Sequence, residues 1–145
     1  MDSTVPLVDI GLVIQLAVAP VFLLSGIGIV LTVLTNRLAR VVDRARRLEE
    51  AARAASGEAL EERRRELVGM ADRARLMNRA ITLSTCSALL VAVVVVLLFL
   101  AALLEFNATV PIAGLFILAM LALIGALVLF LREVFLAIRA LKIGV

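Results

Sequence analysis

Apolar residues fill three long stretches of this chain, and most charged residues lie between the first stretch and the second. The apolar stretches run from Ile10 to Leu34, from Ile81 to Leu104 and from Val110 to Leu131. Each reaches the length of roughly 20 residues that a helix needs to cross ~30 Å of hydrocarbon. The pattern therefore predicts an all-α membrane protein with three transmembrane helices.

The charged stretch between the first two apolar runs predicts a long helical hairpin. Apolar and small residues recur there at alternating spacings of three and four, which is the a and d pattern of a coiled coil. They are Leu38, Val41, Ala45, Leu48, Ala52 and Ala55 in the first arm and Leu60, Leu67, Met70, Ala74, Met77 and Ile81 in the second, where Arg63 occupies the seam position between Leu60 and Leu67. Ser56 and Gly57 interrupt the pattern, and glycine readily supplies the left-handed residue of a turn. We therefore expect a second helix that starts at Glu58 and continues unbroken into the second apolar stretch.

These boundaries divide the chain into five parts. The N-terminal segment and first transmembrane helix take residues 1–35, and the hairpin takes residues 36–80 with its turn at 56–57. The other two transmembrane helices take residues 81–104 and 110–131, and a tail takes residues 132–145. Because the hairpin seam is rich in alanine, it buries little apolar area alone and would gain from packing against hairpins of other copies. We expect a homo-oligomer; the alternative is a two-helix coil within one chain.

The distribution of basic residues predicts an orientation in the membrane. The hairpin contains twelve arginines and the tail adds Arg132, Arg139 and Lys142, whereas the N-terminus and the turn from Glu105 to Thr109 contain no Lys or Arg. By the positive-inside rule the hairpin and the tail are cytoplasmic and the N-terminus is outside. Contact with anionic lipids at the cytoplasmic face is expected from the same distribution.

Two classes of function are disfavoured by composition. Nucleic acid is not an expected partner, because eight acidic residues reduce the hairpin's net charge to +4 (twelve minus eight) and no aromatic residues accompany its arginines. Enzymatic activity is not expected, because the chain has no His, no carboxylate pair within an apolar stretch and no glycine-rich phosphate loop. We expect neither a cofactor nor a metal.

Polar residues follow one side of the first apolar stretch. Written as heptads, Gln15, Phe22, Ile29 and Asn36 share one column, and Ser25 and Thr32 share the adjacent one. Lipid would leave polar groups without hydrogen bonds, so this stripe should face protein or water. If several copies surround an axis, these six residues are candidates to line a pore, with a hydrophobic constriction at Phe22 or Ile29. The alternative is that Ser25 and Thr32 bond back to their own helix and Gln15 lies at the outer surface of the bilayer.

Small residues four positions apart offer close contacts between helices in lipid. The pairs are Gly28 with Thr32, Ala88 with Ala92, and Ala122 with Ala126. Some of them must serve contacts within one subunit, and the sequence does not assign them.

Arginines also gather where the apolar stretches meet the hairpin. The candidates for a basic cluster at the cytoplasmic mouth of an assembly are Arg37, Arg40, Arg44, Arg75, Arg79 and Arg132. Such a cluster would attract anions and repel cations. The alternative is that these arginines only anchor the helices at the headgroups. Glu133 lies so close to the bilayer that it should have a basic partner, for which Arg37 and Arg79 are the candidates.

Three segments of the chain resemble a bacterial membrane family known as domain of unknown function 2721. They are QLAVAPVFLLSGIGIVLTVLTNRLARVVDRARRL from Gln15, RARLMNRAITLSTCSALL from Arg73 and FLREVFLAIRAL from Phe130. The resemblance implies a three-span protein of the bacterial inner membrane and no established activity. The positions that belong to the family's pattern are Pro20, Asn36, Arg37, Asp43, Arg44, Arg79, Arg132 and Glu133.

Two functional hypotheses follow from the sequence. In the first, the protein is a homo-oligomeric channel in which the first transmembrane helix lines a central path and the hairpins form a coiled-coil bundle. In the second, it is a membrane-anchored structural or adaptor protein whose hairpin binds another protein. The polar stripe and the self-complementary hairpin are both expected of a channel, whereas an adaptor needs no polar stripe.

Overall fold

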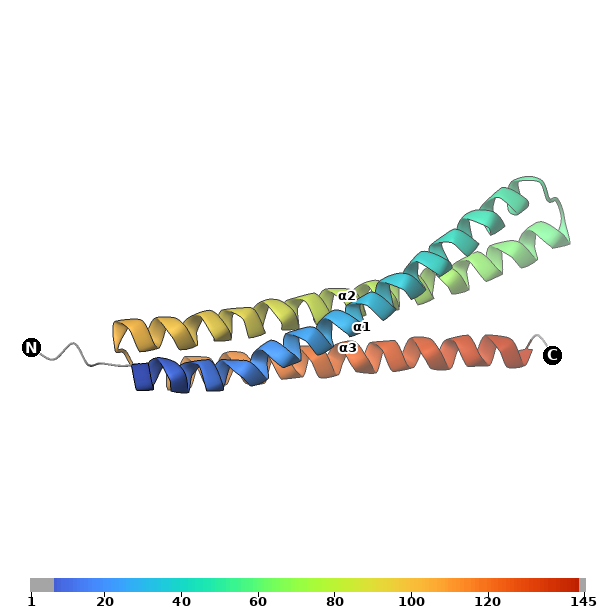
Figure 1. The fold of residues 1–145 in the computed structure, drawn as a ribbon. Coiled ribbons are helices and arrows are strands. Elements are labelled where there is room, and N and C mark those ends of the chain that lie inside the picture. The colour runs from blue at the N-terminus through green and yellow to red at the C-terminus, as the bar shows by residue number, and fades with distance from the viewer. Residues whose placement is uncertain (1–6, 144–145) are drawn as a thin grey trace, which may run out of the picture. The chain divides into compact units, whose positions relative to one another are not determined.

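The computed structural model describes residues 7–143 as three α-helices, with side chains described for residues 10–141. Helix α1 spans Leu7–Arg53, α2 spans Glu58–Leu104 and α3 spans Thr109–Ile143 (Figure 1). All three are long and apolar enough to cross a membrane, and no strand occurs in the described range, so the all-α prediction is confirmed. Residues 1–6 of the expected N-terminal segment, residues 144–145 of the tail and the side chain of Lys142 lie outside the described residues.

A short turn around Gly57 connects α1 to α2. Gly57 adopts a φ of +72°, a conformation in which any other residue would bring its Cβ close to the backbone. The amide of Glu61 donates to the carbonyl of Gly57 at 3.3 Å, which closes the first turn of α2. Glu58 and Glu61 stabilise this helix start because carboxylates interact favourably with the positive end of the helix dipole. Helix α2 then runs from Glu58 to Leu104 without a break, as the pattern predicted.

The turn between α2 and α3 is closed by hydrogen bonds at both helix ends. Glu105 ends α2 in the left-handed conformation, with a φ of 52°, and the amide of Phe106 donates to the carbonyl of Ala101 at 3.3 Å. This is the bond of a helix C-cap that ends in a left-handed residue. Asn107 then accepts bonds from the amide and the hydroxyl of Thr109, at 3.1 and 2.7 Å, and so satisfies a free amide at the start of α3.

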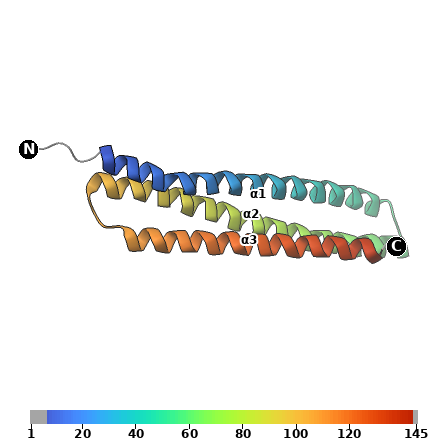
Figure 2. The ribbon, with the colours of Figure 1, turned by 60° about the horizontal axis from the view of Figure 1, so that its bottom comes forward.

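One compact unit consists of residues 7–30 and 83–124. The first part of α1 lies beside the end of α2 and the turn that leads into α3 in both Figure 1 and Figure 2. Its interior is built from small and branched side chains, with Ile27, Val91 and Ala119 almost fully buried. The hydroxyl of Ser87 donates to the carbonyl of Ala119 at 2.8 Å, which links α2 to α3. Such bonds between helices are worth about 0.6 kcal/mol on average in a membrane.

A second compact unit consists of residues 31–82 and 125–143. Its core contains Val41 of α1 with Met70 and Met77 of α2, and Leu38, Ala45, Leu48 and Ala74 pack against them. All seven of these residues belong to the predicted heptad seam. The core therefore shows that the two arms of the hairpin contact each other through this seam.

Helix α3 continues well past the third apolar stretch. It runs twelve residues beyond Leu131, to Ile143, which is about 18 Å at the helical rise. The sequence pattern predicts only a tail for this region. Phe135, Ile138 and Leu141 are exposed on this extension, so it carries apolar side chains at the surface of the second unit.

Candidate functional site

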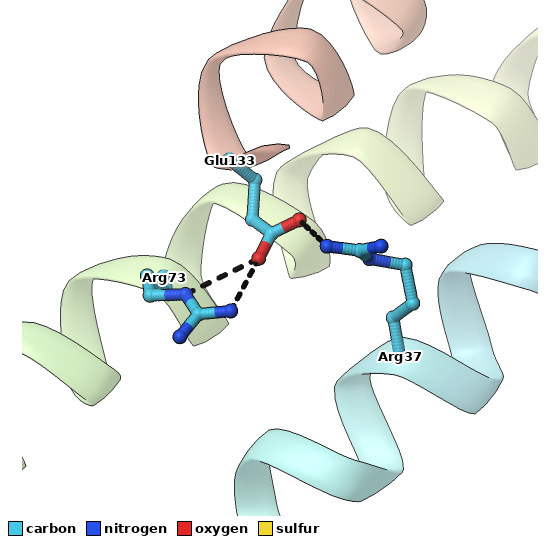
Figure 3. Close-up of polar contacts among 3 residues, drawn as sticks. All are labelled: Arg37, Arg73 and Glu133. Carbon is cyan, nitrogen blue, oxygen red and sulfur yellow. Dashed lines mark hydrogen bonds and ion pairs between the residues drawn. The ribbon is translucent and has the colours of Figure 1, made fainter. Parts of the chain in front are cut away.

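The described structure contains one buried carboxylate, and each of the three helices contributes to its surroundings. Glu133 of α3 is fully buried. Its Oε2 accepts a bond from Nη2 of Arg37 in α1 at 2.8 Å, and its Oε1 accepts bonds from Nη2 and Nε of Arg73 in α2 at 2.8 and 3.2 Å (Figure 3). All three residues belong to the second compact unit. We refer to Arg37, Arg73 and Glu133 as the three-helix ion cluster.

The environment of Arg37 fixes its guanidinium in place. The guanidinium carbon lies 5.4 Å from the centroid of the Phe130 ring, within the range of a cation–π interaction. The Nε of Arg37 is buried and makes no hydrogen bond. An arginine held between an aromatic ring and a carboxylate has lost most of its rotamer freedom, and guanidinium is weakly enough hydrated to tolerate such a site. Arg37 is therefore part of the packing of this unit as well as a charge.

The ion cluster has more positive than negative charge. Two guanidinium groups share one carboxylate, and the arginine side chains are 35% and 21% exposed while the carboxylate is 0% exposed. A buried carboxylate is stable only if its hydrogen bonds are satisfied, and here both oxygens accept charge-assisted bonds. The cluster can hold three helices in one register, and it carries a net positive charge at the end of the apolar stretches.

The expected partner of Glu133 is confirmed in the case of Arg37. Arg79, the other candidate, is exposed, and the second partner, Arg73, was not among the candidates. Arg73 lies next to Ala74, which is the seam position between Met70 and Met77, so the heptad pattern placed Arg73 beside the seam and predicted no partner for it.

Five of the six arginines proposed for the cytoplasmic mouth are exposed. Arg40, Arg44, Arg75, Arg79 and Arg132 lie at the surface, and only Arg37 is partly buried. Arg75 lies 3.9 Å from Asp72 on the same helix, a surface pair that contributes little to stability. All six belong to the second compact unit, and the structure brings only Arg37 against an acidic residue of another helix.

The six proposed pore residues are all exposed on α1. Phe22 is 74% exposed and Ile29 is 67% exposed. The polar members Gln15, Ser25, Thr32 and Asn36 are exposed as well. The hydroxyl of Ser25 donates to the carbonyl of Val21 at 3.4 Å, a long bond within its own helix. The stripe is therefore turned away from the rest of the described chain.

Gly26 and Gly28 lie on the same helix, next to space that the rest of the described chain leaves open. A Cβ added at Gly26 or Gly28 would meet no other atom within 4 Å. By contrast, Ala126 of the third apolar stretch is fully buried, so the pair that it forms with Ala122 serves contacts within the chain. Of the three predicted pairs of small residues, Gly28 with Thr32 is the one in which both members are exposed.

Hydroxyl groups at the start of the second apolar stretch differ in their roles. The hydroxyl of Thr82 donates to the carbonyl of Asn78 on the same helix at 2.9 Å. Ser87 links α2 to α3, as described above, and the hydroxyl of Ser84 is buried without a hydrogen-bond partner. Within the part of the chain that the structure describes, no three His, Cys, Asp or Glu residues lie close enough to hold a metal ion.

A family described as "Protein of unknown function (DUF2721)" matches residues 17–143, a range that includes the three-helix ion cluster and most of the exposed stripe. No curated protein and no solved structure shows significant similarity to the chain.

Proposed function

This chain belongs to the DUF2721 family, and we propose that it forms a homo-oligomeric membrane channel in which copies of α1 surround a central path. The observation that carries this proposal is the exposure of Gln15, Phe22, Ser25, Ile29, Thr32 and Asn36 at the surface of the described chain. The amide side chains of Gln15 and Asn36, which belong to this stripe, would lack hydrogen-bond partners if they faced lipid. Water in a pore, or a second copy of the same helix, would satisfy them.

The exposed glycines support assembly of several copies. Without side chains at Gly26 and Gly28, another helix can approach the backbone of α1 closely, which favours helix association in lipid. The same two positions lie between Phe22 and Ile29. In the proposed channel, these two apolar side chains form the narrowest part of the path and gate it by excluding water.

The exposed arginines give the proposed path an electrostatic preference. With the hairpin on the cytoplasmic side of the bacterial inner membrane, Arg40, Arg44 and Arg79 would surround the cytoplasmic mouth. A ring of unpaired arginines attracts anions and repels cations. The channel is therefore proposed to favour anions, and the hairpins are proposed to form a coiled-coil bundle that fixes the number of subunits.

A second function is supported by the hairpin itself. Its outer surface carries many exposed charges, among them Arg64 and Arg65, and Ser25 has a hydrogen bond within its own helix. Both observations fit a membrane-anchored structural or adaptor protein whose hairpin binds a protein partner. Replacing Arg64 and Arg65 would then abolish partner binding and leave the oligomer intact.

The deciding experiment combines electron cryomicroscopy with flux measurements. The full-length protein in lipid nanodiscs should form a ring in which Ser25, Thr32 and Asn36 face a central axis without lipid. In liposomes, Thr32→Val and Asn36→Leu should change chloride flux several-fold without changing the oligomer. Thr82→Val is the matched control, because its hydroxyl bonds only within α2 and lies outside the stripe. A monomer, or unchanged flux in both stripe variants, would overturn the channel and favour the adaptor.

A further inference from the structure

A groove lies beside the helical extension of α3, within the second compact unit. It has a volume of about 530 Å³ and is lined by Leu76 of α2 and by Arg132, Phe135, Leu136 and Arg139 of α3. The lining combines two guanidinium groups with three apolar side chains. The groove begins at Arg132, one residue beyond the end of the third apolar stretch at Leu131, so it lies at the expected depth of the lipid headgroups.

The two arginines have no carboxylate to neutralise them within this groove. None of the lining residues is acidic, and the neighbouring Glu133 is fully buried and bound by Arg37 and Arg73. Arg132 and Arg139 are seven residues apart, so they lie on nearly the same face of α3 and about 10 Å apart along its axis. The groove therefore presents two exposed positive charges on one helix face.

Apolar surface separates these two charges. Phe135 is 57% exposed and Leu136 is 40% exposed, between the arginines in sequence. Free phosphate or an acidic peptide would bind the arginines and leave this apolar surface exposed to water. A ligand that has a phosphate at one end and hydrocarbon at the other matches both parts of the lining. Both anionic and zwitterionic phospholipids carry a phosphate that a guanidinium group can bind. The anionic lipid is favoured because its headgroup has no cation for the two arginines to repel.

We propose that this groove is a binding site for an anionic phospholipid. Arg132 and Arg139 bind its headgroup phosphate, and Leu76, Phe135 and Leu136 contact the first methylenes of an acyl chain. The proposal is independent of the channel, because it requires only that the end of α3 lies at the membrane surface. It also assigns a role to Phe135 and Leu136, the exposed apolar side chains of this groove on the extension of α3.

Native mass spectrometry of the full-length protein tests the proposal. Protein in detergent micelles is titrated with phosphatidylglycerol and, separately, with phosphatidylcholine of the same acyl chains. We expect at least tenfold tighter retention of phosphatidylglycerol. The double variant Arg132→Gln with Arg139→Gln should lose about 10- to 30-fold in affinity for it, since each basic residue near an anionic lipid contributes about 1 kcal/mol. The double variant Arg132→Lys with Arg139→Lys should keep most of the affinity and so shows that the fold tolerates changes at these exposed positions.

A second double variant separates a specific site from general attraction to charge. Arg64→Gln with Arg65→Gln removes the same charge from exposed positions of the hairpin and should change retention less than twofold. An equal loss in both double variants would overturn the site. Displacement of the lipid by millimolar inorganic phosphate would show that a free anion is the ligand. A change in oligomer mass with no change in lipid retention would show that the groove is a contact between copies. Either result would also overturn the proposal, and none of these results depends on chloride flux.

Discussion

Glu133 of α3 accepts a 2.8 Å hydrogen bond from Arg37 of α1, a residue that lies 96 positions earlier in the chain. Arg73 of α2 binds the other carboxylate oxygen. Transmembrane helices gain little from the hydrophobic effect when they pack on one another, because lipid is as apolar as their own side chains. A single carboxylate that needs two arginines from two other helices can therefore determine the register in which this unit packs.

Replacing Glu133 with Gln should destabilise the protein strongly. The amide would leave Arg37 and Arg73 partly buried without a counterion, and breaking a buried ion pair from one side costs about 3–5 kcal/mol. We expect the thermal transition to fall by on the order of 10 °C. Circular dichroism is the suitable measurement, because the chain contains no Trp or Tyr for intrinsic fluorescence. The control is Glu66→Gln at an exposed position of α2, and equal melting temperatures for the two variants would contradict the proposed role of the cluster.

The two arginines should differ in their tolerance of lysine. Arg73 donates two hydrogen bonds to Glu133 and is 21% exposed, whereas Arg37 donates one and is 35% exposed. Lysine keeps the charge and loses the fixed geometry of the guanidinium. Arg73→Lys should therefore cost about 1.5–3 kcal/mol, the worth of a charge-assisted bond, and Arg37→Lys should cost less. The unfolding free energies of both variants, measured in the same detergent, test this order. The reverse order would mean that the contact of Arg37 with Phe130 is worth more than the second bond of Arg73.

The sequence predicted the helices well, because each depends on a local property. Apolar length identified the three long apolar helices, and Gly57 marked the turn between α1 and α2. One partner of Glu133 was predictable from its position relative to the apolar stretches. Arg37 and Glu133 each lie within three residues of the end of an apolar stretch. Arg73 lies eight residues before the second stretch, so its distance along the chain gave no indication that it reaches the same carboxylate.

The direction that the polar stripe faces could not be predicted in the same way. A heptad pattern shows which residues share a side of a helix, and it does not show which neighbour that side meets. Gln15, Ser25 and Thr32 could equally have faced α2 or α3 and bonded there. Their exposure depends on how the helices pack, which is a property of several helices together.

Two glycines of the hairpin should respond to alanine with opposite signs. Gly57 has a φ of +72°, so Gly57→Ala should destabilise the hairpin by about 1–2 kcal/mol, the cost of a left-handed non-glycine residue. Gly69 lies within α2, and Gly69→Ala should stabilise the protein by up to about 1 kcal/mol, because alanine has the higher helix propensity. Apart from the adjoining backbone, neither added Cβ would meet another atom within 4 Å, so contacts with the rest of the chain do not affect the comparison. A higher melting temperature for Gly57→Ala would show that the turn is not formed as described.

Cross-linking through the exposed face of α1 should join copies of the protein in the membrane. In a background in which the single cysteine is replaced, Cys86→Ala, cysteines are introduced by Phe22→Cys and Ile29→Cys at positions that are 74% and 67% exposed. If this face meets other copies, a short bismaleimide reagent should give dimers and higher species in liposomes at a high ratio of lipid to protein. Phe22 and Ile29 are two turns apart on one side of the helix, so both positions should react.

Two control positions decide whether such cross-links report assembly. Ala17→Cys lies on the same helix at a position that is 5% exposed, and it should not cross-link, because that side packs against the chain's own helices. Leu118→Cys lies on α3 and is 53% exposed, so it measures random collision of lipid-facing positions. Cross-linking at Phe22 and Ile29 that exceeds the Leu118 level by tenfold or more requires a fixed contact along α1. Equal yields at Phe22, Ile29 and Leu118 would mean that the stripe faces lipid, and the central path would then have no helix to line it.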